Sequence, residues 1–141
     1  MILIDTNVFS ELMRPEPDPA VVAWLDAQPE ATLWTTTINA FEMRFGVARM
    51  PHGRRRDALE QAIHDLLRID FAQRVLDFDA SAARHAASFA AEMEAKGRTV
   101  DVRDLFLAGI AASRGAKIAT RDSNRFPSSV QVISPWDHEF R

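Results

Sequence analysis

Five short, mostly apolar segments of this chain alternate with longer stretches that have helical periodicity. Residues 2–4, 32–35, 75–78, 117–120 and 130–133 are typical of strands, and 8–14, 19–27, 37–50, 56–68, 81–96 and 101–114 are typical of helices. Strands that are separated by helices form parallel sheets, because a helical crossover returns the chain to the same edge. The alternation therefore predicts an α/β fold, a three-layer α/β/α sandwich with a mainly parallel central sheet.

Length and composition narrow the class of protein. The 141 residues, 47% hydrophobic and 26% charged, fit a single domain over 1–141, and no repeat or linker divides them. Apolar runs of a few residues predict no membrane span, and the absence of cysteine suits a cytoplasmic protein. A net charge of −3 means that a polyanionic substrate would need a local basic patch or bound cations.

Acidic residues follow two of the expected strands. Asp5 comes directly after the apolar run Ile2–Ile4, and Asp122 comes two residues after segment 117–120. Parallel sheets bind their ligands beyond the carboxyl ends of the strands. Both acids are therefore candidates for a site at this edge of the sheet.

Two further acids lie on expected helices. Ile38, Phe41 and Phe45 predict the inward-facing stripe of one helix, and Glu42 falls within that stripe. Asp104 lies among the apolar residues of the helix over 101–114. Both carboxylates are expected to point inward.

Each acid also has a structural interpretation of its own. Asp5 or Asn7 could cap the first helix, and Asp122 could be a turn residue. Asp104 could lie in a helical first turn behind Asp101 as the N-cap, where it would favour the helix dipole. Glu42 has the weakest structural interpretation, because a glutamate on an apolar stripe needs a partner such as Arg44 or Arg49.

The four acids together predict a metal site. Carboxylates that converge repel one another and raise one another's pKa unless a cation lies among them. Oxygen ligands without His or Cys favour Mg²⁺ or Mn²⁺. Such an ion activates water and neutralises a phosphodiester in its transition state, which would explain why a buried strand ends on Asp5.

The motifs that carry these acids resemble a known family. The segments MILIDTNVFSELMRPEP, VRDLFLAGIAA and ATRD, with the Glu42 helix between them, resemble the PIN-domain ribonucleases, and the final PW resembles the FitB-like branch of VapC toxins. The resemblance implies a Mg²⁺- or Mn²⁺-dependent endoribonuclease that hydrolyses RNA. It also implies a toxin of a type II toxin–antitoxin system, a homodimer that assembles with a VapB-type antitoxin encoded nearby.

The resemblance also implies roles for individual residues. By motif position, the catalytic and metal-binding quartet is Asp5, Glu42, Asp104 and Asp122. Thr6 and Asn7 match the polar residues that support the first aspartate.

Three residues depart from the family pattern and leave alternatives open. Asn39, Phe41 and Arg103 stand where the family usually has Thr or Ser, a small residue, and Ala. The departures at Phe41 and Arg103 keep a non-catalytic module that binds antitoxin or RNA as the alternative. A phosphatase with Asp5 as nucleophile is weaker, because Asn7 stands where that class needs a second Asp.

One basic cluster is dense enough to attract a polyanion. Arg54, Arg55 and Arg56 follow one another in a predicted turn, with Arg49 and His52 nearby. Charge runs of this kind are usually solvated helix faces. The alternative is an RNA-contacting edge that supplies the phosphate attraction missing from the net charge.

Overall fold

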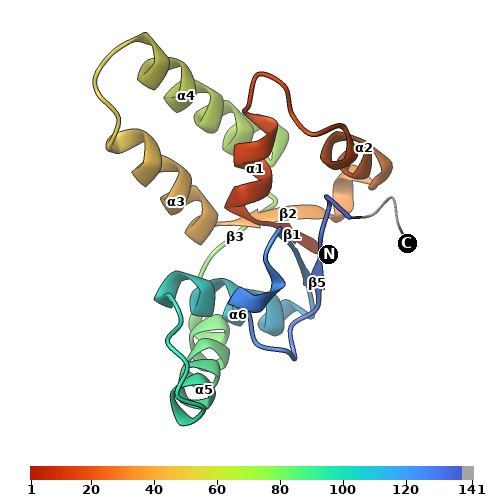
Figure 1. Cartoon of the computed structure of the whole chain (residues 1–141), viewed down its shortest axis with the longest axis vertical. Coiled ribbons are helices and arrows are strands. Elements are labelled where there is room, and N and C mark those ends of the chain that lie inside the picture. The colour runs from red at the N-terminus through yellow and green to blue at the C-terminus, as the bar shows by residue number, and fades with distance from the viewer. Residues whose placement is uncertain (138–141) are drawn as a thin grey trace.

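The computed structural model describes residues 1–137, and its centre is a five-stranded parallel sheet (Figure 1). The strands lie in the order β3-β2-β1-β4-β5, and each neighbouring pair is parallel. Their bounds are β1 Ile2–Ile4, β2 Leu33–Thr36, β3 Val75–Leu76, β4 Lys117–Ala119 and β5 Val132–Ile133. The predicted parallel sheet is confirmed. Because β1 is the central strand, the residue after it lies in the middle of the carboxyl edge.

Helices cover both faces of the sheet. On one face lie α1 (Thr6–Leu12), α2 (Pro19–Ala27), α3 (Thr37–Ala48) and α4 (Arg54–Asp65), and on the other lie α5 (Ala80–Ala95) and α6 (Val102–Arg114) (Figure 1). This arrangement confirms the three-layer α/β/α sandwich. None of the helices in residues 1–137 is long and apolar enough to cross a membrane.

The core lies on both sides of β1. Leu3 packs with Leu107 of α6, whereas Ile4 packs with Val8 and Phe9 of α1, and all five are almost fully buried. Successive side chains of a strand point to opposite faces. A strand covered on both faces is therefore apolar throughout, which is why Ile2–Ile4 has no polar alternation.

The layer of α5 and α6 depends on a close approach at Gly109. A Cβ at this position would lie 2.4 Å from the carbonyl oxygen of Ala82 and 2.9 Å from the Cβ of Ala86. Only glycine avoids these clashes, since the atom that would be struck first belongs to the backbone. The alanine-rich composition of α5 serves the same close packing.

The element bounds differ from the expected ones in a few places. Helix α1 begins at Thr6, because the carboxylate of Asp5 accepts from the Thr6 amide and caps the helix. Helix α4 ends in a π-helical turn over Leu66–Asp70, and β3 and β5 are shorter than expected. The short 3-10 helix Ser123–Arg125, which the sequence pattern did not predict, follows β4 and brings its last residue over the carboxyl edge.

Candidate active site

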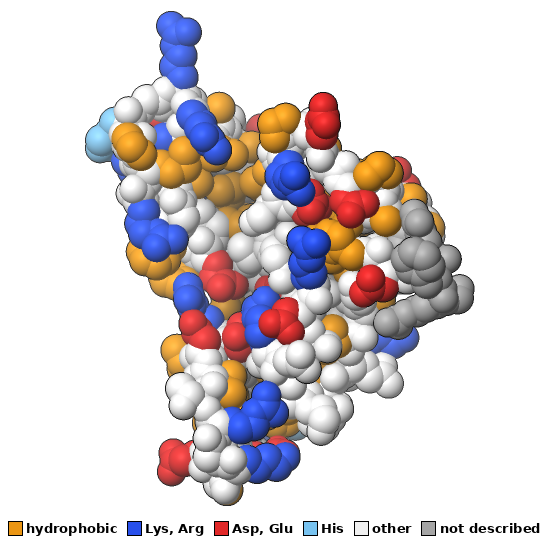
Figure 2. Space-filling model, viewed as in Figure 1, with side chains coloured by type: hydrophobic (Ala, Val, Ile, Leu, Met, Phe, Trp, Pro, Cys, Tyr) orange, Lys and Arg blue, Asp and Glu red, His pale blue; other side chains and the backbone are white. Residues whose placement is uncertain are grey.

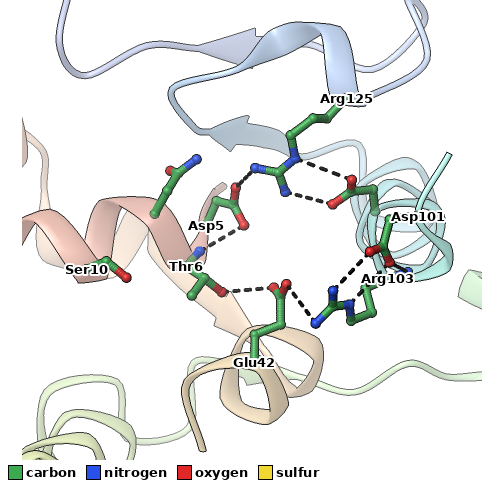
Figure 3. Close-up of a pocket in the computed structure, with 9 residues that line it drawn as sticks. Asp5, Thr6, Ser10, Glu42, Asp101, Arg103 and Arg125 are labelled. Atoms are coloured by element: carbon green, nitrogen blue, oxygen red, sulfur yellow. Dashed lines mark hydrogen bonds and ion pairs between the residues drawn. The ribbon is translucent and has the colours of Figure 1, made fainter. Parts of the chain in front are cut away.

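A pocket of about 340 Å³ opens at the carboxyl edge of the sheet (Figure 3). Figure 2 shows acidic and basic side chains side by side on this face of the molecule. The residues that line the pocket come from β1, α1, α3, α6 and the turn after β4, and they are Asp5, Thr6, Asn7, Ser10, Glu42, Asp101, Arg103, Asp104 and Arg125. Three of the four predicted acids, Asp5, Glu42 and Asp104, therefore share one cavity.

Asp5 is 1% exposed, and both of its carboxylate oxygens accept hydrogen bonds. Oδ1 accepts from the amide of Thr6 at 2.8 Å and from Nδ2 of Asn39 at 3.1 Å. Oδ2 accepts from Oγ1 of Thr120 at 2.8 Å and from Nη1 of Arg125 at 3.0 Å. The hydrogen bond from the Thr6 amide is the helix cap that the structural interpretation of Asp5 expects, but it is one of four contacts of this carboxylate. Burial of this carboxylate depends on the whole set.

Glu42 reaches the pocket, although the predicted inward stripe of its helix is wrong. Phe41 and Phe45 are exposed, whereas the buried residues of α3 are Asn39, Met43 and Val47. The phenylalanines lie on a separate, exposed apolar surface. Which face of α3 is covered therefore depends on how the other layers pack against it, and the periodicity of the sequence does not contain that information. Glu42 lies between these two faces.

The carboxylate of Glu42 is held by Thr6 and lies beside Arg103. Oε1 accepts from Oγ1 of Thr6 at 2.9 Å, and Oε2 lies 3.8 Å from Nη1 of Arg103. Burial raises the pKa of Glu42 above its usual value, the Thr6 hydrogen bond lowers it, and the charge of Asp5 raises it again, with a net upward shift. The expected partners Arg44 and Arg49 are replaced by a residue from α6.

Asp104 lies in the first turn of α6 and is paired with Arg125. Oδ1 accepts from Nη2 at 2.7 Å and Oδ2 accepts from Nε at 3.3 Å, so the guanidinium contacts both oxygens. Burial lowers the pKa of Arg125, but the hydrogen bond with Asp104 and the charges of Asp5 and Asp104 outweigh it and raise this pKa above its usual value. The same guanidinium also reaches Asp5, which makes Arg125 a bridge between two acids (Figure 3).

Asp101 and Arg103 form a second pair at the rim of the pocket. The carboxylate of Asp101 caps α6 and accepts from Nη2 of Arg103 at 2.9 Å and from Nε at 3.2 Å. These side-chain bonds lower the pKa of Asp101 below its usual value. Four carboxylates and two guanidinium groups thus line the pocket, a formal excess of two negative charges.

Asp122 lies outside the lining of this pocket. Its side chain is exposed at the N-cap of the 3-10 helix, and Oδ1 accepts from the amide of Asn124 at 3.0 Å. This contact is the one that the turn interpretation expects. The catalytic and metal-binding role of Asp122 stays a prediction.

The two supporting residues both line the pocket. Oγ1 of Thr6 donates to Glu42 and accepts from Nδ2 of Asn39, so this hydroxyl connects α1 to α3. Nδ2 of Asn7 donates to Oγ1 of Thr120 at 2.9 Å, the hydroxyl that in turn donates to Asp5. Thr6 and Asn7 are therefore placed to orient the acids.

The basic cluster lies away from this pocket. Helix α4 begins at Arg54, at the end of the α3–α4 hairpin that points away from the sheet (Figure 1). Arg54 and Arg55 are exposed, whereas Nη1 of Arg56 donates to the carbonyl oxygen of Met50 at 3.2 Å. RNA contact by these residues stays a prediction, and Arg56 has a structural role in addition.

The donor set fits a hard divalent cation in its chemistry, since four carboxylates without sulfur or imidazole line the pocket. Within residues 1–137, however, no three acidic, histidine or cysteine side chains are gathered closely enough to hold a metal ion. The guanidinium of Arg125 lies between the carboxylates of Asp5 and Asp104. The ligand type fits, and the position between two of the ligands is taken by a cationic side chain.

Sequence reasoning missed Arg125 and Thr120. Thr120 had a usable signal, because the register pairs Ile4 with Ala119 and so places the next residues, Asp5 and Thr120, side by side. Arg125 had a weaker one, namely that converging acids require a cation. The expectation assigned that requirement to a metal ion alone.

Comparison with known proteins adds the family. The PIN domain model matches residues 2–128. Plasmid stability protein StbB of Pseudomonas syringae pv. tomato is 43% identical, and VapC ribonuclease Y4jK of Sinorhizobium fredii is 40% identical, each over 97% of this chain and 99% of the relative. Toxin FitB of Neisseria gonorrhoeae is 34% identical over 96% of this chain and 99% of its own length.

A solved structure agrees with the sequence comparison. The crystal structure of FitAcB from Neisseria gonorrhoeae superimposes with a TM-score of 0.88 at 34% identity, covering 96% of this chain and 99% of that chain. The residues matched by the family model include Asp5, Glu42 and Asp104. With the acid-lined pocket at the carboxyl edge of a parallel sheet, these likenesses show that the chain belongs to the PIN-domain family.

Proposed function

We propose that this protein is a Mg²⁺- or Mn²⁺-dependent endoribonuclease and the toxin of a type II toxin–antitoxin pair. The observation that carries the proposal is the convergence of Asp5, Glu42 and Asp104, from the end of β1, from α3 and from α6, on one open pocket. Relatives named as a VapC ribonuclease and as toxin FitB support the same reaction and the same biological role.

Asp5 and Asp104 would be the primary metal ligands, with Glu42 completing the set directly or through water. Asp122, at the exposed cap of the 3-10 helix, is the fourth ligand expected from the family motif. A bound divalent ion supplies activated water and offsets the charge that develops on the phosphodiester.

The chain itself orients these carboxylates. Asn39 and Thr120 bind the two oxygens of Asp5, one on each side, and Thr6 holds Glu42. Because Thr6 and Asn39 lie in the first turns of α1 and α3 and Thr120 directly follows β4, the acids have little freedom to rotate. Fixed ligands reduce the reorganisation that the transition state would otherwise require.

RNA would enter from the open side of the pocket, where Arg103 lies. The side chain of Arg103 is 37% exposed and is shared between Asp101 and Glu42. A guanidinium in this position can bind a backbone phosphate by paired hydrogen bonds. This contact would counter the repulsion between the acids and the polyanion.

The expected partner is a VapB-type antitoxin that inserts a cationic side chain into the pocket. The pocket has an excess of carboxylates over guanidinium groups, and such a site attracts Arg or Lys from a partner. An antitoxin that binds there would exclude both metal and RNA. The resulting assembly is a hetero-oligomer of toxin and antitoxin.

The toxin itself is expected to be a homodimer. Next to the pocket, an apolar groove of about 480 Å³ is lined by Ile38, Phe41, Phe45, Val102, Arg103 and Phe106. Phe41 and Val102 are 53% and 54% exposed. Contiguous exposed apolar residues mark interaction surfaces, and a second copy of the chain is the occupant that the family resemblance implies.

The alternative is a catalytically weak module that binds antitoxin or RNA without cleaving it. The observation in its favour is the bridge between Asp5, Arg125 and Asp104, in which one guanidinium occupies two of the acids that catalysis requires. Arg103 likewise offsets the negative charge of a third acid, Glu42.

RNA cleavage separates the two functions. The purified protein should cut RNA with Mg²⁺ or Mn²⁺ and stop in excess EDTA, and Asp5→Asn or Asp104→Asn should abolish cutting while circular dichroism shows an intact fold. The variants also exclude a contaminating nuclease, because contamination would survive them. Undiminished cutting by either variant, or in EDTA, would refute the metal-dependent mechanism, whereas RNA binding without cutting would support the alternative.

A further inference from the structure

The guanidinium of Arg125 lies between the two carboxylates that a metal ion would use first. Nη1 is 3.0 Å from Oδ2 of Asp5, and Nη2 is 2.7 Å from Oδ1 of Asp104. Nε is in addition 3.3 Å from Oδ2 of Asp104. One side chain therefore provides the direct charge compensation for two acids from different layers of the fold.

The low exposure of the two acids explains why this compensation is needed. The side chains of Asp5 and Asp104 are 1% and 14% exposed, and that of Arg125 is 29% exposed. An uncompensated carboxylate at such depth is strongly unfavourable. Arg103, the other cation of the pocket, lies nearest to Asp101 and Glu42 and leaves this pair to Arg125.

A divalent ion and the guanidinium exclude each other from this position. Mg²⁺ contacts its oxygen ligands at about 2.0–2.1 Å, which requires carboxylate oxygens that are free to turn toward it. Both oxygens of Asp104 and one oxygen of Asp5 are instead bonded to Arg125. Two cations in the same gap would also repel each other.

We propose that Arg125 is a built-in competitor for the divalent cation: it bridges Asp5 and Asp104 in the metal-free protein, is displaced when the ion binds, and so sets the metal affinity of the site. This inference rests on the metal dependence proposed above. It assigns Arg125 a positioning role, since it keeps the acids paired and in place until metal arrives.

The local structure allows this displacement without rearrangement of the fold. Arg125 ends a one-turn 3-10 helix in the connection between β4 and β5, and the next residue, Phe126, is buried in the core. The backbone is thereby anchored, while the long side chain reaches the acids from outside the sheet. Rotation of the side chain is sufficient to open the gap.

Metal affinity measured by calorimetry tests the proposal without RNA. Mn²⁺ is titrated into the wild type, into Arg125→Gln, and into Arg103→Gln as the matched control, which removes the same charge from the same pocket but not from the bridge. Losing hydrogen bonds to a charged group typically changes the free energy by 1.5–3 kcal/mol, so Arg125→Gln should lower the Kd about ten- to a hundredfold. Arg103→Gln, which alters only the general charge, should lower it much less.

Two further measurements guard against misfolding of the variant. In EDTA, Arg125→Gln should melt below the wild type, and saturating Mn²⁺ should remove most of this difference, because the ion replaces the lost cation. In the wild type itself, the NMR signal of the Arg125 Nε–H should shift on addition of Mg²⁺. The missing signal in Arg125→Gln assigns it.

The outcomes distinguish this inference from the proposed function. An equal or higher Kd for Arg125→Gln, or an Nε–H signal that ignores Mg²⁺, overturns the competitor role even if RNA is cleaved. A much lower Kd in a protein that cuts no RNA keeps the competitor role and refutes the nuclease. Failure of every variant to bind Mn²⁺ overturns both.

Discussion

The side-chain amide of Asn39 donates to the carboxylate of Asp5 at 3.1 Å, from a helix that begins after the neighbouring strand. Asn39 is fully buried, and its Oδ1 accepts from Oγ1 of Thr36 at 2.6 Å, which fixes the orientation of the amide. Asn39, one of the three residues that depart from the family pattern, therefore connects the cap of α3 to the central acid of the site. Thr or Ser at this position would have a shorter reach.

Asn39→Ala should destabilise the protein and slow RNA cleavage. The change leaves Oδ1 of Asp5 with the Thr6 amide as its remaining donor and removes the Asn39 donor from Oγ1 of Thr6, which should lower the free energy of unfolding by roughly 2–3 kcal/mol. Urea denaturation measures this loss, and Gln61→Ala on the exposed face of α4 is the control that should change little. A variant as stable as the wild type, with full activity, would show that the amide does not position Asp5.

Glu42→Gln should change the pH dependence of stability in the metal-free protein. The pKa of Glu42 is raised in the folded state, so folding favours its protonated form. Its contribution to stability is complete below the unfolded pKa of about 4.3 and is lost as the pH rises through the higher folded pKa. Gln stays neutral at every pH, so it does not lose this contribution. As the pH rises from the unfolded pKa to the folded pKa, the stability of the variant should therefore increase relative to that of the wild type, and above the folded pKa the difference should stay constant.

Thermal melts in EDTA between about pH 4 and pH 8 measure this gain. Glu60→Gln, at an exposed position of α4, is the matched control and should show no such trend. If the difference between Glu42→Gln and wild type is the same at every pH, the burial and the neighbouring charge of Asp5 do not disfavour the charged form of Glu42.

Replacing Arg54, Arg55 and Arg56 with Ala tests whether the outer end of the α3–α4 hairpin contacts RNA. Each lost phosphate contact should weaken RNA binding. It should also reduce the magnitude of the slope of the logarithm of the binding constant against the logarithm of the salt concentration by about 0.7–0.9. Filter binding with the inactive Asp5→Asn background at several salt concentrations gives the slope. The control removes three exposed cations elsewhere, Arg84, Arg114 and Lys117. Equal slopes for both triple variants would leave the basic cluster as a solvated helix face.

The apolar surface of α3 should hold two copies of the protein together. Phe41 and Phe45 stack with ring centroids 5.7 Å apart and are 53% and 42% exposed. Replacing both with Ser should convert the dimer to a monomer in analytical ultracentrifugation, because the interface loses its largest apolar groups. Ile69→Ser, at an exposed position outside this groove, is the control and should leave the dimer intact. A double variant that still sediments as a dimer places the interface elsewhere.

The regular elements were predictable because their side chains repeat. An apolar run followed by Asp5 located the central strand, and the parallel register then placed the ends of the neighbouring strands beside it. Asp104 was placed by the apolar residues around it on α6. Glu42 was placed in the pocket for a partly wrong reason, since Phe41 and Phe45 face outward.

The turn after β4 was not predictable in the same way. Asp122 and Arg125 lie three residues apart in a segment without periodicity, and the side chain that faces the acids is the arginine. A one-turn 3-10 helix decides this orientation, through contacts that depend on the assembled sheet. Loop side chains at a site are thus the part of the prediction that needs the tertiary structure.

The same bridge reverses the expected effect of removing an acid from the metal-free protein. Four converging carboxylates without a cation would repel, and Asp104→Asn would then raise the melting temperature. Because Arg125 compensates Asp104 with two hydrogen bonds, Asp104→Asn should instead lower it in EDTA, leaving a half-buried guanidinium with only Asp5. Mn²⁺ should increase the difference in melting temperature between wild type and Asp104→Asn, since the variant has lost a ligand and gains less stability from the ion.

A double-mutant cycle of Asp104→Asn and Arg125→Gln in EDTA isolates the pair. The losses in the free energy of unfolding caused by the two single changes should add up to more than the loss in the double variant. The difference, which is the coupling energy, should be about 0.5–3 kcal/mol. Asp101→Asn combined with Arg125→Gln is the control cycle, because Asp101 pairs with Arg103. Its coupling should be smaller. A melting temperature that rises in Asp104→Asn, with no coupling to Arg125→Gln, would mean that repulsion among the acids outweighs the bridge, and the metal-free site would be the uncompensated cluster after all.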